Sequence, residues 1–372
     1  MNQENHYIGL MSGTSMDGVD GVLVALNDGA QQQVRLVAHA HLPFSAGIRA
    51  QAMRLQQPGE NEIHEEAMLA NELAALYAEC VNALREQAPG VAVRAVGVHG
   101  QTIRHRPELA YTRQVNQPAL LAELCGIDVV ADFRSRDIAA GGQGAPLVPA
   151  FHQAVFGSRS ELRVVANIGG IANISVLHPD ERVSGFDTGP GNVLMDYWIN
   201  LRKQLPYDAN GDWAAQGEVQ PALLKDLMNE AYLHLPPPKS TGRDLFHAEW
   251  LQQHLRDFTH LQPADVQASL CAYTAETLAQ AIAQHGPGAA SVYVCGGGAF
   301  NRKLMGMLQA ALTNADCLAA VRSTADLGVA PEHVEALAFA WLAQQFCLRR
   351  PGNLPAVTGA RGPRILGALY PA

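Results

Sequence analysis

The chain has 372 residues, a length typical of about two to three domains, and its hydrophobic fraction of 48% is enough for two substantial cores. The formal net charge of −9 argues against nucleic acid or an anionic membrane surface as the main partner. No apolar run approaches the length of a membrane span, and no signal peptide is recognised. Six scattered cysteines without paired spacing indicate reduced thiols, so we expect a cytoplasmic protein with a small-molecule substrate.

Strands and helices alternate in the first half of the chain. In order, the pattern predicts three strands up to residue 42, helices over 46–88 with a break at Pro58, a strand at 94–98 followed by a loop, a helix at 118–125 and a strand at 127–131. A glycine-rich passage at 139–145 is interpreted as the connection between two lobes.

The second half repeats the scheme with a helical insertion. We expect a helix at 149–156, a hairpin from residue 162, a mainly helical insertion over 213–260, a helix at 264–284, a strand at 291–295 and a helix at 331–349. The tail at 352–372 is expected to pack on the first lobe. This alternation predicts an α/β fold with mixed sheets.

The loop from Met11 to Gly18 lies between two apolar runs and is predicted to be a hairpin tip. Its glycines would let backbone N–H groups converge on an anion. Hydroxyl groups could add donors, and Asp17 could hold a hydrated Mg²⁺ beside a phosphate. The alternative is an ordinary Gly-Asp turn, which a single such loop would favour.

Similar loops recur at three further places in the chain. Residues 167–173 lie between two strands, whereas residues 187–192 and 296–301 each join a strand to a helix. Four such loops favour binding of a phosphate-bearing ligand. The chain has neither a P-loop nor a G-x-G-x-x-G that opens a helix after its first strand, so we expect two similar lobes, each with a phosphate-binding hairpin.

Several polar residues at predicted strand ends are candidates for chemistry. Asp187, followed by Gly-Pro-Gly, could act as a general base or hold a metal, or could merely cap a turn. His99 is a candidate base or substrate donor with an equal case for a structural role, and His105 is expected on the solvated surface. Between Asp132 and Asp137, an arginine that binds a substrate carboxylate is favoured over a surface ion-pair network. For Lys239–Arg243, a rigid turn is favoured over a cationic loop above phosphates.

Eight segments closely resemble the anhydro-N-acetylmuramic acid kinase family: 10–20, 99–102, 132–149, 167–173, 185–196, 238–243, 294–301 and 351–371. The resemblance implies the two-lobed actin-like ATPase fold of the sugar-kinase, Hsp70 and actin superfamily, with mixed β-sheets flanked by helices and an interlobe cleft. The implied lobes are 1–137 plus 352–372, and 138–351. A homodimer is compatible with the resemblance.

The implied activity uses ATP and Mg²⁺ to open the ring of 1,6-anhydro-N-acetylmuramic acid and phosphorylate O6, a step in peptidoglycan recycling. The alternatives are an ordinary sugar-hydroxyl kinase of the same fold and a nucleotide-driven binding protein. The sequence offers no appended peptide-binding domain for the latter.

The resemblance also implies roles for individual residues. Asp187 is the expected catalytic base, and Asp17 is expected to hold Mg²⁺ through water. Contacts to ATP and its phosphates are expected from Gly13, Thr14, Ser15, Met16, Asp17, Gly18, Val19, Asp20, Asn167, Gly169, Gly170, Gly189, Gly191, Asn192, Gly296, Gly297, Gly298 and Asn301. Contacts to the sugar are expected from His99, Gly100, Gln101, Asp132, Arg134 and Arg136.

Overall fold

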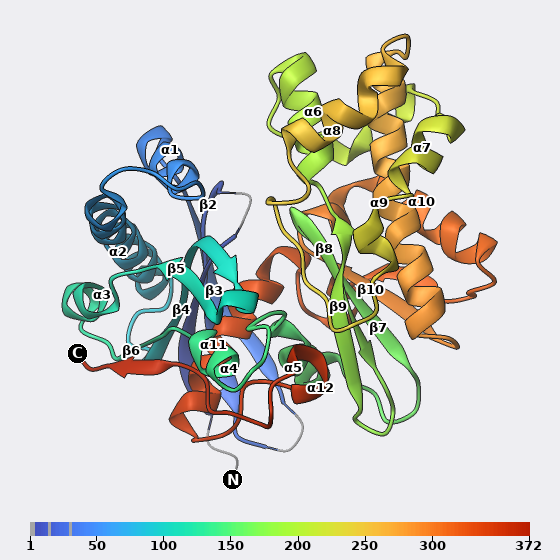
Figure 1. Cartoon of the computed structure of the whole chain (residues 1–372). Helices are drawn as coiled ribbons and strands as arrows, with labels where there is room; N and C mark the ends of the chain where they lie inside the picture. Colours follow the sequence, from blue (N-terminus) through green and yellow to red (C-terminus); the bar gives the residue numbers. More distant parts are fainter. Residues whose placement is uncertain (1–3, 14–15, 30–31) are drawn as a thin grey trace. The chain divides into compact units, whose positions relative to one another are not determined.

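A computed structural model describes residues 4–13, 16–29 and 32–372 (Figure 1). The chain divides into two compact units, which we describe separately. Unit 1 comprises the residues up to Val155 together with His333–Ala372, and unit 2 comprises Phe156–Glu332. The division therefore falls at residues 155 and 333 rather than at the predicted 137 and 352.

Within the described residues, unit 1 contains a seven-stranded sheet in the order β12-β6-β4-β1-β2-β3, with β5 paired to β4. β1 is antiparallel to β2 and parallel to β4, so the sheet is mixed. The strands are β1 (Glu4–Ser12), β2 (Gly18–Asn27), β3 (Val34–Pro43), β4 (Val93–Arg106), β5 (Tyr111–Val115), β6 (Val129–Ala131) and β12 (Ala368–Tyr370).

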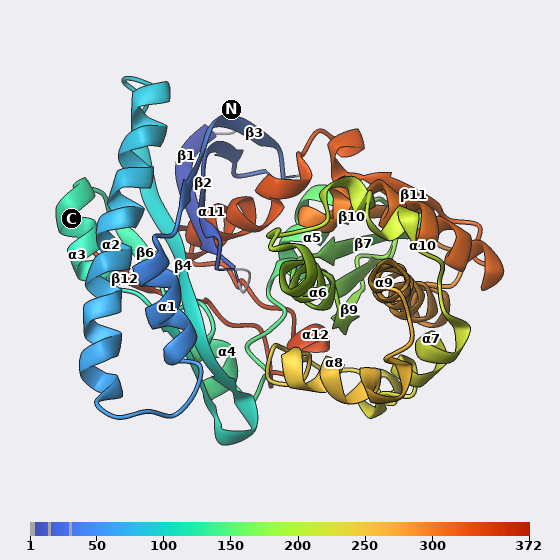
Figure 2. The same ribbon diagram turned by 90° about the horizontal axis from the view of Figure 1, so that it is seen from above.

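Helices cover both faces of this sheet (Figure 2). The long helix α2 (Glu62–Gln87) packs on one face, where a Cβ on Gly21 would overlap the Cys80 sulfur, and α11 (Val334–Cys347) packs on the other. A Cβ on Gly9 or Gly97 would overlap the α11 backbone at Ala336 or Phe339, so these glycines allow the helix to approach closely. This packing places the 331–349 helix in unit 1. The remaining helices are α1 (Ala46–Arg54), α3 (Pro118–Cys125), α4 (Ser135–Ala139), α5 (Val148–Phe156) and α12 (Pro355–Thr358).

The glycine-rich passage at 139–145 lies inside unit 1 and does not join the units, contrary to our expectation. Its backbone is held by hydrogen bonds, from the Gly142 N–H to the Asp137 carbonyl (3.0 Å) and from the Gln143 N–H to the Thr358 carbonyl (2.7 Å). The tail thus packs beside this passage, and β12 extends the sheet by pairing with β6.

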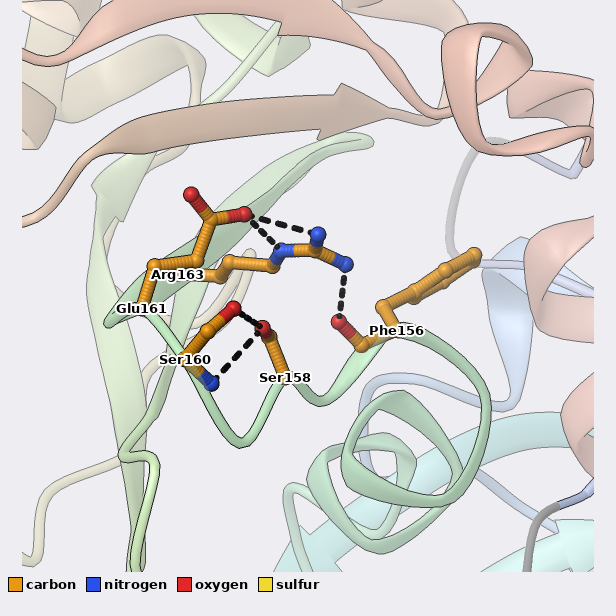
Figure 3. Close-up of polar contacts among 5 residues, drawn as sticks. All are labelled: Phe156, Ser158, Ser160, Glu161 and Arg163. Carbon is orange, nitrogen blue, oxygen red and sulfur yellow. Dashed lines mark hydrogen bonds and ion pairs between the residues drawn. The ribbon is translucent and has the colours of Figure 1, made fainter.

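Unit 2 begins with a braced turn that leads from α5 into the first strand of its sheet (Figure 3). Arg163 donates to the Phe156 carbonyl (3.0 Å) and pairs with Glu161 (2.7 Å). The hydroxyl groups of Ser158 and Ser160 form a hydrogen bond of 3.1 Å. The chain therefore enters unit 2 through a fixed turn rather than through consecutive glycines.

The described part of unit 2 contains a five-stranded sheet in the order β11-β10-β7-β8-β9. β7, β8 and β9 are antiparallel neighbours (Figure 1), whereas β10 is parallel to both β7 and β11, and this second mixed sheet confirms the predicted α/β class. The strands are β7 (Arg163–Ile168), β8 (Ile171–Leu177), β9 (Val183–Pro190), β10 (Ser291–Cys295) and β11 (Ala320–Ser323).

Most residues of the long helix α9 (Pro263–His285) are buried, and α9 shares the core of unit 2 with the sheet and the other helices. The others are α6 (Val193–Lys203), α7 (Pro221–Leu227), α8 (Ala248–His254) and α10 (Arg302–Asn314), together with short 3₁₀ turns. None of the helices in the described ranges is long and apolar enough to cross a membrane.

Candidate functional site

The predicted phosphate loop of unit 1 joins β1 to β2, as expected for a hairpin tip. Thr14 and Ser15 lie outside the described residues. Met16 has a left-handed backbone (φ 56°), its N–H donates to the Gly13 carbonyl (3.2 Å), and its own carbonyl accepts from Arg49 (3.0 Å). The Met16 side chain is buried in the core. Met16 therefore anchors the loop to the core of unit 1 through its buried side chain and its backbone hydrogen bonds.

The residues that follow Met16 have different surroundings. Asp17 is exposed, and its carbonyl accepts from the Phe44 N–H (2.9 Å). Val19 is fully buried in the core, and a Cβ on Gly18 would overlap the Leu42 carbonyl oxygen. Asp20 pairs with His41 across the sheet at 2.8 Å; burial raises the pKa of Asp20, although His41 opposes the shift. Among Asp17–Asp20, the side chains of Asp17 and Asp20 are accessible, and that of Asp20 is paired with His41.

His99 lies inside β4, not in a loop after it, because the strand continues to Arg106 beyond the predicted end at residue 98. Its Nε2 accepts from the Arg134 guanidinium, with distances of 3.0 Å to Nε and 2.9 Å to an Nη. Its ring packs on Phe339 with centroids 4.7 Å apart. Burial lowers the pKa of His99 well below its usual range, and the charge of Arg134 lowers it further. His99 is therefore a neutral imidazole.

Gln101 supports the phosphate loop of unit 1. Its side chain is fully buried, and its amide donates to the Gly13 carbonyl (3.2 Å). Gly100 has φ +83°, and a Cβ there would press on the Val115 carbonyl. Gln101 of β4 is the strand partner of Ser12 at the end of β1. The pairing therefore places the polar residues at 99–101 next to the loop. His105 is half-buried and bonds Thr112 (3.0 Å), so the expectation of a solvated surface residue is wrong.

The segment from Asp132 to Asp137 contains three polar side chains whose hydrogen bonds are structural. Asp132 accepts from the Ser135 N–H (3.3 Å) at the start of α4. Arg134 donates to the Gly144 carbonyl (2.7 Å) as well as to His99. The fully buried Asp137 accepts from the Gly144 N–H (2.8 Å), Asn353 (2.6 Å) and Thr358 (2.8 Å). Asp137 was not predicted as a functional residue, and its only signal was the crowding of charge in this segment.

Arg136 differs from Arg134 in its exposure. It projects from α4 with an exposed side chain, whereas Arg134 is half-buried against His99 and Gly144. The geometry thus gives Arg134 a bracing role in unit 1. Arg136 is the arginine of this segment whose guanidinium is accessible to a carboxylate.

In unit 2 the Gly169-Gly170 hairpin tip packs against the loop that follows β9. The carbonyl of Gly169 accepts from the Asn192 N–H (2.8 Å), and the carbonyl of Gly170 accepts from the N–H groups of Gly191 (2.9 Å) and Val193 (3.1 Å). A Cβ on Gly191 would overlap the Gly169 carbonyl oxygen. Two of the predicted loops are therefore one structural element.

The Gly296–Gly298 loop joins the same element. A Cβ on Gly296 would press on Asn167 Oδ1, and a Cβ on Gly298 would overlap the Ile168 side chain. Gly297 is different, because it is exposed and the nearest atom to a Cβ there would be Asn192 Nδ2 at 3.7 Å. The structure thus brings together the predicted residues Asn167, Gly169, Gly170, Gly191, Asn192, Gly296, Gly297 and Gly298.

Asn301 has a structural contact at the edge of this cluster. Its Oδ1 accepts from the Leu304 N–H (3.0 Å), which caps the start of α10, and the residue is 8% exposed. Gly189 has φ +151° and packs near Leu233 and Thr277.

Asp187 lies in β9, the edge strand of the sheet, opposite Asn173 of β8. The pairing shifts register at Thr188, whose hydroxyl bonds the Ala172 carbonyl (3.2 Å), and such bulges re-aim the adjacent side chains. Asp187 is 9% exposed, and its Oδ2 accepts from the Thr241 N–H (3.0 Å). A carboxylate can act as a general base, and this one has a fixed hydrogen-bond donor on Oδ2.

The donor set for a metal is small. No cluster of three or more His, Cys, Asp or Glu side chains that could hold an ion occurs in the ranges the structure describes. Magnesium often binds through one or two carboxylates while keeping several waters and contacting phosphates. The exposed carboxylate of Asp17, beside the unit 1 loop, fits this mode of binding.

Comparison with known proteins identifies the family. The family model described as anhydro-N-acetylmuramic acid kinase matches residues 5–372. The chain belongs to this family. It is 57% identical to an anhydro-N-acetylmuramic acid kinase of Cupriavidus pinatubonensis over 99% of both chains. It is 56% identical to another of Burkholderia orbicola, over 98% of this chain and 96% of that protein.

Among solved structures, the chain is similar to the activator of the 2-hydroxyisocaproyl-CoA dehydratase from Clostridium difficile with bound ADPNP. The identity is 13%, the TM-score is 0.45, and the alignment covers 92% of this chain and 96% of that one. Structural similarity at this level does not help to assign the functional residues. Their assignment depends on the geometry of this structure and on the family match.

Proposed function

We propose that this protein is an ATP-dependent kinase that opens the 1,6-anhydro ring of 1,6-anhydro-N-acetylmuramic acid with water and phosphorylates O6. The products would be N-acetylmuramic acid 6-phosphate and ADP. The observation that supports this most strongly is the family match over residues 5–372, with relatives of that name at 56–57% identity. The proposed setting is peptidoglycan recycling in the cytoplasm.

Asp187 is the proposed general base. Its carboxylate is oriented by the Thr241 N–H and lies beside a bulge, in a largely buried position. Asp187 would take a proton from water as the water oxygen forms a bond to C1 and the C1–O6 bond breaks, as in an inverting glycosidase. An inverting glycosidase needs a second carboxylic acid to protonate the leaving oxygen. Here O6 would instead form its new bond to the γ-phosphorus of ATP, while the bond from that phosphorus to the bridging oxygen of the β-phosphate breaks and ADP leaves.

Phosphoryl transfer depends on placement and on neutralising negative charge. The Gly169-Gly170 tip and the Gly13–Gly18 loop are the proposed phosphate-binding elements, one in each unit. The exposed face of Gly297 beside Asn192 is the proposed contact for the nucleoside part. Asp17 would hold Mg²⁺ through water, and a bound Mg²⁺ would reduce the negative charge of the phosphates.

Recognition of the sugar is proposed to involve unit 1. Arg136 is exposed and could bind the lactyl carboxylate in a bidentate manner. Neutral His99 and buried Gln101 would act through the shape of the loop region that they support. The proposal therefore assigns the carboxylate to Arg136 rather than to Arg134.

The product made in ¹⁸O-labelled water tests this function. Ring opening by water predicts one ¹⁸O atom at C1 of the phosphorylated sugar, detected by mass spectrometry after a short reaction. Because the hydroxyl at C1 exchanges with solvent, unlabelled product incubated in the same water for the same time is the control. A phosphorylated product labelled no more than this control would indicate an ordinary sugar-hydroxyl kinase. ATP turnover that does not respond to the anhydro sugar would indicate a nucleotide-driven binding protein.

A further inference from the structure

The edge of β9 at Asp187 is covered by a segment that is far away in the sequence. On the side away from β8, the Asp187 N–H donates to the Lys239 carbonyl (3.4 Å). The Asp187 carbonyl accepts from the Tyr232 hydroxyl (2.7 Å). An edge strand has backbone groups without a strand partner. Here Lys239 and Tyr232 bond those groups at the very residue proposed as the base.

Lys239 connects the two parts of this covering segment. Its ammonium donates to the carbonyls of Tyr232 (3.1 Å) and Leu233 (2.9 Å). It also lies over the Tyr232 ring at 4.8 Å and the Phe186 ring at 5.5 Å from their centroids. The ammonium is therefore directed toward carbonyls and rings of unit 2. This geometry argues against the cationic loop above phosphates considered from the sequence.

These bonds form a closed circuit of three residues. Asp187 donates through its N–H to Lys239, Lys239 donates through Nζ to Tyr232, and Tyr232 donates through its hydroxyl to Asp187. Two residues beyond Lys239, the Thr241 N–H reaches Oδ2 of the Asp187 carboxylate (3.0 Å). The position of that N–H thus depends on the anchoring of Lys239.

Electrostatics supports the same arrangement. Burial lowers the pKa of Lys239, whereas the negative charge of Asp187 acts in the opposite direction. Burial also raises the pKa of the Tyr232 hydroxyl, and the charges of Asp187 and Asp244 add to this effect. Tyr232 therefore stays protonated and can donate to Asp187 throughout the physiological range of pH.

We propose that Lys239 and Tyr232 are positioning residues for Asp187, which together with the Thr241 N–H hold its carboxylate in one orientation for catalysis. The inference rests on the proposed function, because it requires Asp187 to be the base. It assigns a role to the segment at 239–241 that is neither phosphate binding nor a passive turn.

Lys239→Met tests the anchor, since it keeps the length of the side chain and removes the ammonium. We expect kcat to fall by about 10²-fold, because small misplacements of a catalytic group have effects of this size. KM for ATP should change little. Lys203→Met is the matched control, because Lys203 lies over the Trp213 ring at 4.7 Å and belongs to the same unit, on α6. It should leave kcat unchanged.

Tyr232→Phe is a milder test that keeps the ring packed against Phe246. Loss of the single hydroxyl donor should lower kcat by about tenfold. Tyr197→Phe is its control, since the Tyr197 hydroxyl accepts from Gln252 (2.7 Å) and does not contact the Asp187 circuit. If Lys239→Met reduces the melting temperature too far for assay, Tyr232→Phe decides. Wild-type kcat in the folded variants would overturn the inference.

A double variant separates the inference from the proposed function. If Lys239 acts through Asp187, adding Lys239→Met to Asp187→Asn should cause no further loss in single-turnover rate. A further loss of about 10²-fold would show that Lys239 acts elsewhere and overturn the inference. Near wild-type activity of Asp187→Asn alone would instead remove Asp187 as the base, which is a failure of the proposed function.

Discussion

The two units build their candidate sites by different means. In unit 2 the site is mostly backbone, with glycine loops at 169–170, 191 and 296–298 packed against one another. In unit 1 the loop after β1 is held by side chains, including Arg49 and Gln101, and the nearby His99 is fixed by Arg134. Substitutions in the glycine loops of unit 2 should therefore act mainly through shape, and those around the unit 1 loop mainly through hydrogen bonds and charge.

The comparison also shows that glycines with the same sequence signal differ physically. Gly191, Gly296 and Gly298 are required by packing, because a Cβ at each would press on neighbouring atoms. Gly169 and Gly297 are open in the sense that a Cβ there would meet its nearest atom at 3.7 Å, an ordinary van der Waals contact. Open glycines in a loop that is otherwise packed are the ones at which we expect a ligand to approach.

The largest expected effect is at Asp187, the one carboxylate that we assign to chemistry in unit 2. Asp187→Asn keeps the shape and removes the basic oxygen, so kcat should fall by about 10²–10⁴-fold. ATP affinity, measured by calorimetry, should remain close to wild type. Asp180→Asn is the control, because Asp180 pairs with Arg182 on the exposed turn between β8 and β9. Wild-type turnover of Asp187→Asn would exclude it as the base.

The next effect separates the two kinds of glycine in unit 2. Gly297→Val should fold normally and weaken ATP binding by about tenfold or more, which corresponds to about 1.4 kcal/mol. Gly298→Ala should instead destabilise the fold by about 1–3 kcal/mol through overpacking against Ile168. Calorimetric titration and thermal melting measure the two quantities.

Gly306→Ala is the control for both glycine variants, since a Cβ there meets nothing within 4 Å on α10. It should leave ATP affinity unchanged and raise the stability by about 0.5–1 kcal/mol, because Gly306 lies inside helix α10. If Gly297→Val bound ATP as tightly as the wild type, the exposed face of Gly297 would not be part of the nucleotide site.

Much of this architecture could be predicted from local sequence patterns. The α/β class, the hairpins around Gly13 and Gly169, and the helices α1 and α2 follow from hydrophobic periodicity and turn residues. Strand β4 was predicted to end at residue 98 because its second half is polar, yet pairing with β5 continues it to Arg106. Only residues 107–110 separate these two strands, so the polar composition of this hairpin, and not distance along the chain, hid the strand.

The missing parts of the site have a different cause, which is contact between residues far apart in the sequence. Asp137 joins Gly144 to Asn353 and Thr358, and Lys239 anchors the segment over Asp187, although the sequence separates these groups by up to 221 residues. The boundary between the units was also displaced, because α11 packs on Gly9 and Gly97 of the first sheet. Such contacts depend on tertiary packing, which the residue types alone do not specify.

A smaller effect is expected in unit 1, from a buried histidine. His152 is fully buried, and burial lowers its pKa to about 3 from the usual 6.5. Because the unfolded chain takes up the proton first, stability should be lost as the pH falls from about 6.5 toward 3. The slope is about 1.4 kcal/mol per pH unit for one proton. His152→Met should reduce this slope in urea unfolding between pH 6 and 4.5.

The exposed His64 provides the comparison for that slope. His64→Gln, at an exposed position of α2, is the control substitution in the same urea-unfolding measurement. An unchanged slope in His152→Met would show that His152 does not contribute to acid destabilisation. A reduced slope would show that part of the pH dependence of stability in unit 1 comes from His152, which lies outside the candidate site.

The smallest effect concerns two arginines with different surroundings, Arg134 at the N-terminus of α4 and Arg136 within α4. Arg134 donates to His99 and its charge lowers the pKa of His99, whereas Arg136 is exposed on α4. Arg134→Gln should therefore raise the pKa of His99, since burial remains but the neighbouring positive charge is lost. Arg136→Gln should leave that pKa unchanged and raise KM for the sugar. Nitrogen-15 NMR titration of the His99 ring and steady-state kinetics measure the two responses. If Arg136→Gln moved the titration of His99 while Arg134→Gln did not, the bracing and binding roles would have to be exchanged.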